Sequence, residues 1–154
     1  MVDPQRDVSG YVHYARAQGL AIERVIETHV HAGFLSGHLE LADRTGALIS
    51  YGEGVEVDFP IEQLHDGQRV VLGDVSLEIR ATPGHTPESI SVVIYEHADD
   101  AVPYGVLTGD ALFIGDVGRP DLLLASGAGL TADAMARQLF HSLHTKLLTL
   151  PDAT

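Results

Sequence analysis

The sequence predicts an α/β sandwich, in which helices cover the outer faces of sheets, and three observations carry this prediction. Residues 75–81 alternate between apolar and polar side chains, as a strand with one buried face does. The runs 90–95 and 106–108 are continuously apolar, which is typical of strands covered on both faces. Four apolar residues near the end of the chain recur at every fourth position and indicate an amphipathic helix: Met135, Leu139, Leu143 and Leu147.

The N-terminal part of the chain carries signals for two helices and two strands. Ser9 is placed to cap a first helix that runs to about Gln18, with an inner face formed by Tyr11, Tyr14, Ala15 and Ala17. A strand at 24–28 ends where the histidines begin. A second helix is expected over 36–44, and a strand at 47–51 follows it. The inward-facing residues of this helix would be Leu39, Leu41 and Ala42.

The rest of the chain has the signals of a sheet followed by a helix. Turns at 66–67 and 73–74 bound a strand at 70–72, and Thr131 is a typical N-cap for the final helix. Residues 2–4 resemble the end of a strand, and the final helix would normally lead back into the sheet. We therefore read residues 1–154 as a single domain that is incomplete at both ends.

Composition narrows the classes of function. The 154 residues are 45% hydrophobic and 20% charged, which is an ordinary globular balance. A net charge of −13 would repel a phosphate backbone, so we expect no nucleic-acid partner. No apolar run could cross a bilayer, so we expect no membrane partner. Cysteine is absent, which fits a cytoplasmic protein and leaves imidazoles and carboxylates as the metal ligands.

Three short segments each place a potential metal ligand at the end of a predicted strand. His29 and His31 are two residues apart, so on a strand they would point the same way and either share a metal or support one another. Two prolines and a glycine hold the loop that carries His85. Asp110 follows a buried strand, where a carboxylate needs a partner or a cation. Each residue alone also fits a structural role in a turn or at a strand end.

Together, His29, His85 and Asp110 would form a facial triad of two imidazoles and one carboxylate. Fe(II) in such a site can bind a thiol and O₂ side by side, whereas Zn²⁺ would activate a water for hydrolysis. The spacing of the residues leaves the choice between iron and zinc open.

The motifs, in their order along the chain, resemble those of the metallo-β-lactamase superfamily. They are the segments 29–34, 83–86 and 109–110. The longer run 109–122, with residues 27–32 and 34–42, is similar to persulfide dioxygenases, particularly the bacterial ones fused to rhodanese domains. This resemblance implies an αββα sandwich with a metal at the edge of the sheets.

The resemblance also implies a reaction. A low-molecular-weight thiol persulfide, such as glutathione persulfide, would be oxidised by O₂ to sulfite and thiol at an Fe(II) centre. The implied ligands are His29, His85 and Asp110. His31 would stand beside the metal, Arg119 would shape the site or meet an anionic substrate, and Asp121 would hold that arginine. A purely structural role for the last two is an equal alternative.

The chain departs from the superfamily pattern at two positions and at its ends. Gly33 stands where the superfamily has aspartate, and Phe34 stands where it has histidine. Those two residues build a second metal site, so their loss argues against a binuclear zinc hydrolase. Strands of the family domain at both ends are missing, which would expose sheet faces. We therefore expect either a homo-oligomer or a longer, rhodanese-fused parent protein.

Two alternatives to the dioxygenase stay open from the sequence. One is a zinc-dependent thioester hydrolase of the glyoxalase II type. The other is a degenerate, non-catalytic module of the same fold, for which Gly33 is the main argument.

Overall fold

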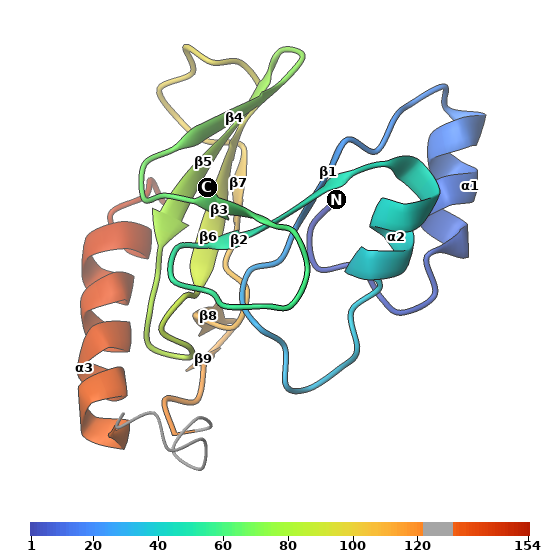
Figure 1. Ribbon diagram of the computed structural model, residues 1–154. Helices are drawn as coiled ribbons and strands as arrows, with labels where there is room; N and C mark the ends of the chain where they lie inside the picture. The colour runs from blue at the N-terminus through green and yellow to red at the C-terminus, as the bar shows by residue number, and fades with distance from the viewer. Residues whose placement is uncertain (122–130) are drawn as a thin grey trace.

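Helices flank a central body of strands in the computed structural model, which describes residues 1–121 and 131–154 (Figure 1). In chain order the elements are α1 (Ser9–Ala17), β1 (Arg24–Ile26), α2 (His38–Thr45), β2 (Leu48–Gly52), β3 (Glu62–Leu64), β4 (Arg69–Leu72), β5 (Val75–Ala81), β6 (Ile90–Tyr95), β7 (Gly105–Leu107), β8 (Leu112–Phe113), β9 (Asp116–Val117), α3 (Ala132–Ser142) and the π-helical turn η2 (Leu143–Leu147). None of the helices within the described ranges has the length and apolar character to span a membrane.

The strands form two larger sheets and one small hairpin. The first sheet has the order β1-β2-β3 with parallel pairing throughout, and α2 makes the crossover between its first two strands. The second sheet, β4-β5-β6-β7, is antiparallel, and β8 pairs with β9 as a separate hairpin. Val2 joins the first sheet through a single parallel bridge to Ile26, which brings the start of the chain beside the end of β1.

The two larger sheets pack face to face, because alternate residues of their strands point into a shared core. The buried side chains of this core come from both sheets and are Ile26, Leu64, Val70, Leu77, Ile79, Ile90 and Val92. Removing these apolar side chains from water stabilises the sandwich, by about 1.5–3 kcal/mol for each large one.

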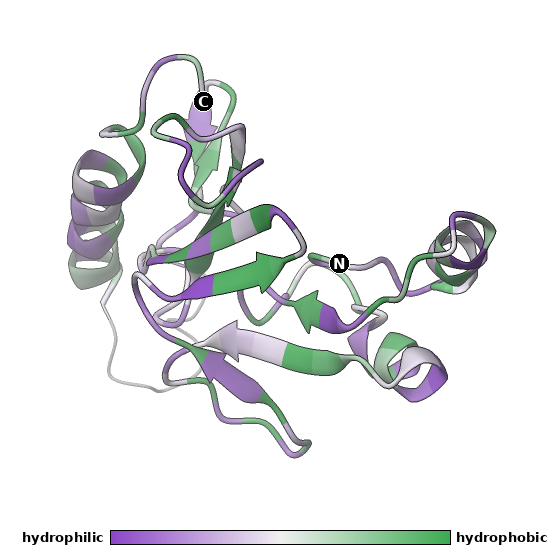
Figure 2. Ribbon diagram, turned by 90° about the horizontal axis from the view of Figure 1, so that it is seen from above, coloured by the Kyte–Doolittle hydropathy of each residue, from purple (hydrophilic) through white to green (hydrophobic). Residues whose placement is uncertain are grey.

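Helices cover the outer face of each sheet. α1 and α2 pack on β1 through Val8, Val12, Val25 and Leu41. α3 and η2 lie on the opposite side of the molecule and pack on Ala111 and the adjoining strands (Figures 1 and 2). The arrangement is helix, sheet, sheet, helix, which confirms the predicted α/β sandwich.

Several elements agree closely with the sequence prediction. The strands β5 and β6 have the predicted bounds, 75–81 and 90–95. Thr131 caps α3, since its Oγ1 accepts a hydrogen bond of 3.1 Å from the backbone N–H of Ala134. All four residues of the predicted apolar stripe are buried: Met135, Leu139, Leu143 and Leu147.

The prediction for the first helix was wrong in its cap and partly wrong in its inner face, of which Ala15 is buried and Tyr11 partly buried. Ser9 does not cap α1; its backbone N–H instead donates to Oδ1 of Asp7 at 3.0 Å. The buried face is formed by Val12 and Ala15, whereas Tyr14 is 65% exposed. Val8, Val12 and Ala15 lie on one face at helical spacing, and this aliphatic stripe determines which side meets the sheet.

Other differences arise where an element lies at an edge. β7 is the last strand of its sheet and only partly buried, so the prediction that 106–108 is covered on both faces was wrong. α2 begins at His38 rather than residue 36, and its Leu39 is exposed rather than inward-facing. β3 was not predicted, because Leu64 is its only buried side chain and a three-residue strand gives no clear alternation.

Candidate metal centre

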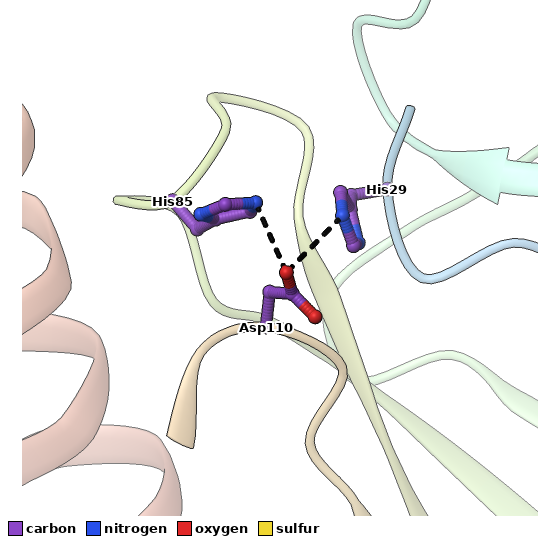
Figure 3. Close-up of side chains that lie close together, drawn as sticks. All are labelled: His29, His85 and Asp110. Carbon is purple, nitrogen blue, oxygen red and sulfur yellow. Dashed lines mark ion pairs between the residues drawn. The ribbon is translucent and has the colours of Figure 1, made fainter. Parts of the chain in front are cut away.

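Three loops that follow strands bring His29, His85 and Asp110 together (Figure 3). Oδ2 of Asp110 lies 3.4 Å from Nε2 of His85 and 3.9 Å from Nε2 of His29. All three potential ligand atoms lie within 4.8 Å of one another. The structure thus places the three residues next to each other, as the sequence motifs predicted.

Two glycines allow these loops to approach closely. Gly84 has a φ of +141°, and a Cβ at this position would lie 2.4 Å from Cα of Leu139 in α3. Gly109 has a φ of +51°, and its Cβ would lie 2.7 Å from Oγ1 of Thr28. Both conformations are costly for any residue with a side chain. The two glycines therefore fix where His85 and Asp110, which follow them directly, enter the centre.

Hydrogen bonds fix the orientation of both imidazole rings. Nδ1 of His85 lies 3.1 Å from the backbone carbonyl oxygen of Arg119, which can only accept, so this nitrogen carries the proton. Nδ1 of His29 lies 3.0 Å from Oγ1 of Thr28, and that hydroxyl donates to Oδ2 of Asp3 at 2.8 Å. The hydroxyl therefore accepts from His29. In both rings the Nε2 lone pair is left free to face Asp110.

The protonation states suit a cation. Burial lowers the pKa of His29 to about 4, with a further contribution from the charge of His31, so its imidazole is neutral near pH 7. His29 and His85 are 2% and 5% exposed, whereas the Asp110 side chain remains 44% exposed. Metal–ligand bonds of about 2.0–2.2 Å place neighbouring donor atoms about 3–3.5 Å apart. The donor set therefore fits one first-row divalent cation; the 3.4 Å separation between His85 and Asp110 matches this range, and the 3.9 Å separation between His29 and Asp110 is wider.

His31 belongs to a second cluster beside the first. Its Nε2 lies 2.9 Å from Oδ1 of Asp3 and 3.4 Å from Oε2 of Glu27. The ring centroids of His29 and His31 are only 4.1 Å apart. Burial opposes the charged form of His31, but the hydrogen bond and the charge of Asp3 outweigh it and raise the pKa of this imidazole. Burial raises the pKa of Glu27 to about 7.

Sequence reasoning missed Asp3 and Glu27. Asp3 accepts hydrogen bonds from the backbone N–H and the hydroxyl of Thr28, both at 2.8 Å, and also contacts His31. The parallel bridge between Val2 and Ile26 brings it there, and a single bridge leaves no pattern in the sequence. Glu27 precedes the first histidine by two positions, and only its burial distinguishes it from an ordinary strand-end carboxylate.

Arg119 reaches the centre through its backbone rather than its side chain. Its guanidinium donates to both carboxylate oxygens of Asp121 at 3.0 and 2.9 Å, and its side chain is 69% exposed. Its carbonyl oxygen orients His85. The pairing of Arg119 with Asp121 matches the expected arrangement, while contact of either with substrate stays a prediction. Leu122, the last residue of the run used for the resemblance, lies outside the described residues.

A pocket of about 780 Å³ opens onto the centre. Phe34 and Leu35 form an apolar part of its lining, and Arg6 contributes a basic side chain. Gly33 also lines the pocket, and a Cβ there would meet no atom within 4 Å. The space beside the three candidate ligands is therefore large enough for a small organic molecule.

Comparisons with known proteins find relatives and solved structures that share one fold. The mitochondrial persulfide dioxygenase ETHE1 of Bos taurus is 32% identical over 98% of this chain and 54% of its own length. A metallo-β-lactamase from Staphylococcus aureus is 36% identical with a TM-score of 0.86, over 99% of this chain and 45% of that one. ETHE1 from Myxococcus xanthus is 29% identical with a TM-score of 0.79, over 99% of this chain and 60% of that one.

These similarities confirm the resemblance that the motifs predicted. No protein-family model matches the chain. The chain spans about half the length of the curated relatives it matches, 54% and 46% for the bovine and human enzymes.

Proposed function

This chain has the metallo-β-lactamase fold, and on that premise we propose that it oxidises a low-molecular-weight thiol persulfide, such as glutathione persulfide, with O₂. The proposal assigns Fe(II) to His29, His85 and Asp110. Sequence similarity to persulfide dioxygenases over 98% of the chain supports it. The single structural observation that carries it is that both Nε2 atoms, each with its ring fixed through Nδ1, face one carboxylate.

The residues that replace the superfamily's second metal site favour a dioxygenase over a binuclear hydrolase. Gly33 and Phe34 line the pocket where that superfamily carries an aspartate and a histidine. Phe34 also packs against His31, with ring centroids 4.4 Å apart and the rings tilted. An apolar wall at this point suits a sulfur substituent.

In the proposed reaction, one persulfide, one O₂ and one water give one thiol, one sulfite and two protons. Fe(II), when bound, supplies the redox chemistry with O₂ that no side chain offers. Neutral His29 and His85 hold the cation, and Asp110 neutralises part of its charge. Asp3 and His31 line the same pocket and are 2.9 Å apart, so this pair faces the space that the substrate would occupy.

The proposal extends to the setting of the protein. A rhodanese domain in a longer parent protein, assembly into a homo-oligomer and a cytoplasmic location are the expectations we carry forward from the sequence.

The test is O₂ uptake with glutathione persulfide by protein purified under anaerobic conditions, with bound metal identified by elemental analysis. We expect iron, and one sulfite formed per O₂ consumed. His85→Ala and Asp110→Asn should lower the rate at least 100-fold, whereas His13→Ala, which removes an exposed imidazole from α1, should not. Bound zinc without O₂ uptake would reject the proposal, and hydrolysis of S-lactoylglutathione would then identify the glyoxalase II type. Absence of tight metal binding would favour the non-catalytic module.

A further inference from the structure

A second group of ligating side chains lies beside the first, and no motif brings these three residues together as one site. Oδ1 of Asp3, Oε2 of Glu27 and Nε2 of His31 lie within 4.8 Å of one another. We propose that these three residues form a second site for a first-row divalent cation. This inference does not depend on the oxidation of persulfides.

A buried carboxylate oxygen without a hydrogen-bond partner favours cation binding at this place. Glu27 is fully buried, and its Oε1 accepts a hydrogen bond of 2.7 Å from Oγ of Ser36. Its Oε2 has no hydrogen-bond partner, although it lies 3.4 Å from Nε2 of His31. That nitrogen can carry only one proton, which the 2.9 Å contact directs to Asp3. A buried carboxylate oxygen without a donor is rare in folded proteins and requires an explanation.

Spacing and charge both suit a divalent cation. The separations of 2.9 and 3.4 Å between His31 and the two carboxylates are those of neighbouring ligands around a cation with bonds of about 2.0–2.2 Å. Once Glu27 is ionised and His31 has released its proton, the two carboxylates and the imidazole carry a net charge of −2 in a largely buried place. Bound Mn²⁺, Fe²⁺ or Zn²⁺ would compensate that charge, and the oxygen-rich set favours Mn²⁺ or Fe²⁺.

The site is largely formed in advance and can be reached from solvent. Two hydrogen bonds of 2.8 Å from Thr28 already hold the Asp3 carboxylate, one at each oxygen. On binding, Nε2 of His31 would release its proton and exchange the contact with Asp3 for a shared cation. Asp3 and His31 line the pocket of the first centre, so a cation enters by the same opening.

This site differs from the second metal position of the superfamily, which uses the residues that Gly33 and Phe34 replace. Here the ligands come from the start of the chain and from both sides of His29. The two clusters are direct neighbours, since the rings of His29 and His31 are 4.1 Å apart. Two cations bound in them would be close enough for their unpaired electrons to interact.

The experiment is a titration of chelator-treated protein with Mn²⁺ alone, followed by electron paramagnetic resonance and elemental analysis. We expect two Mn²⁺ per chain and a spectrum broadened by coupling between them. Glu27→Gln and His85→Ala should each bind one Mn²⁺ and lose the coupling, because they remove one site each. Glu23→Gln removes an exposed carboxylate nearby in sequence and should keep both.

Saturation of the unaltered chain at one Mn²⁺, or two coupled Mn²⁺ in Glu27→Gln, would overturn the proposal. If circular dichroism shows that Glu27→Gln does not fold, His31→Asn replaces it, and the count for the unaltered chain still decides. Because no persulfide or O₂ is present, a negative result leaves the dioxygenase proposal untouched. Equally, a chain without oxygenase activity could still bind two Mn²⁺.

Discussion

The hydroxyl of Thr28 lies 3.0 Å from Nδ1 of His29 and holds this ring with Nε2 toward the centre. The same hydroxyl donates to Asp3, so a chain of two hydrogen bonds connects the start of the protein to a candidate ligand. Thr28 is 1% exposed, which keeps water from replacing either bond. Partners of this kind determine both the tautomer of a ligating histidine and its affinity for metal.

Replacement of Thr28 by valine should therefore weaken metal binding without a change of side-chain shape. We expect Thr28→Val to lower Fe²⁺ affinity roughly 10- to 100-fold, as measured by anaerobic competition with a chelator. Thr28→Ser keeps the hydroxyl and should restore most of the affinity. If serine, which keeps the hydroxyl, weakens binding as much as valine does, the hydroxyl is not what holds His29 and the orienting role is wrong.

Two glycines near the centre should respond very differently to an added methyl group. Gly84→Ala should lower the free energy of unfolding by roughly 2–4 kcal/mol, because its Cβ would collide with the backbone of α3 at a positive φ. Gly33→Ala should change it by less than about 0.5 kcal/mol, since the new Cβ meets no atom within 4 Å. Urea denaturation measures both, and a large loss in Gly33→Ala would contradict the structure of the pocket wall.

The sequence predicted the three candidate ligands because each lies in a short, contiguous motif directly after a strand. Strand ends of a sandwich gather at one edge, so alternation and turn signals were enough to bring His29, His85 and Asp110 together. The role of Arg119 was harder to predict, because its contact with His85 uses a backbone carbonyl that every residue possesses.

Asp3 shows what local patterns miss. Its contacts with Thr28 and His31 span 25 and 28 residues and depend on one bridge between Val2 and Ile26. This relationship leaves no periodic signal, so it required the tertiary structure.

The metal-free protein should become less stable with rising pH because of Glu27. Its pKa is raised from 4.5 in the unfolded chain to about 7 in the folded one by burial. Between these values the folded state binds more protons, so this stabilising contribution is complete below about pH 4.5 and is lost as pH rises through 7. Glu27→Gln lacks this contribution. The free energy of unfolding of Glu27→Gln, relative to that of the unaltered chain, should therefore increase by roughly 2–3 kcal/mol from pH 5 to pH 8.

His29 changes stability with pH in the opposite direction, and it is present both in Glu27→Gln and in the unaltered chain. Its folded pKa of about 4 lies below the ordinary 6.5, so its contribution is present above 6.5 and is lost as pH falls toward 4. Comparison of Glu27→Gln with the unaltered chain, each denatured by urea in the presence of EDTA, cancels this effect. A difference between them that does not vary with pH would show that Glu27 remains ionised when buried.

Arg6 should govern how the pocket receives an anionic substrate. It is the one arginine or lysine among the described residues that line the pocket, and its guanidinium pairs with Glu40. In a protein of net charge −13, a carboxylate of glutathione persulfide has few favourable positions near the centre. We expect Arg6→Gln to raise KM for glutathione persulfide roughly 3- to 10-fold with little change in kcat, because an exposed ion pair contributes modestly.

An uncharged alkyl persulfide should show no such effect, and Arg16→Gln, an exposed change on α1, should leave KM for both substrates unaffected. Equal increases for charged and uncharged persulfides would mean that Arg6 shapes the pocket rather than binds the carboxylate.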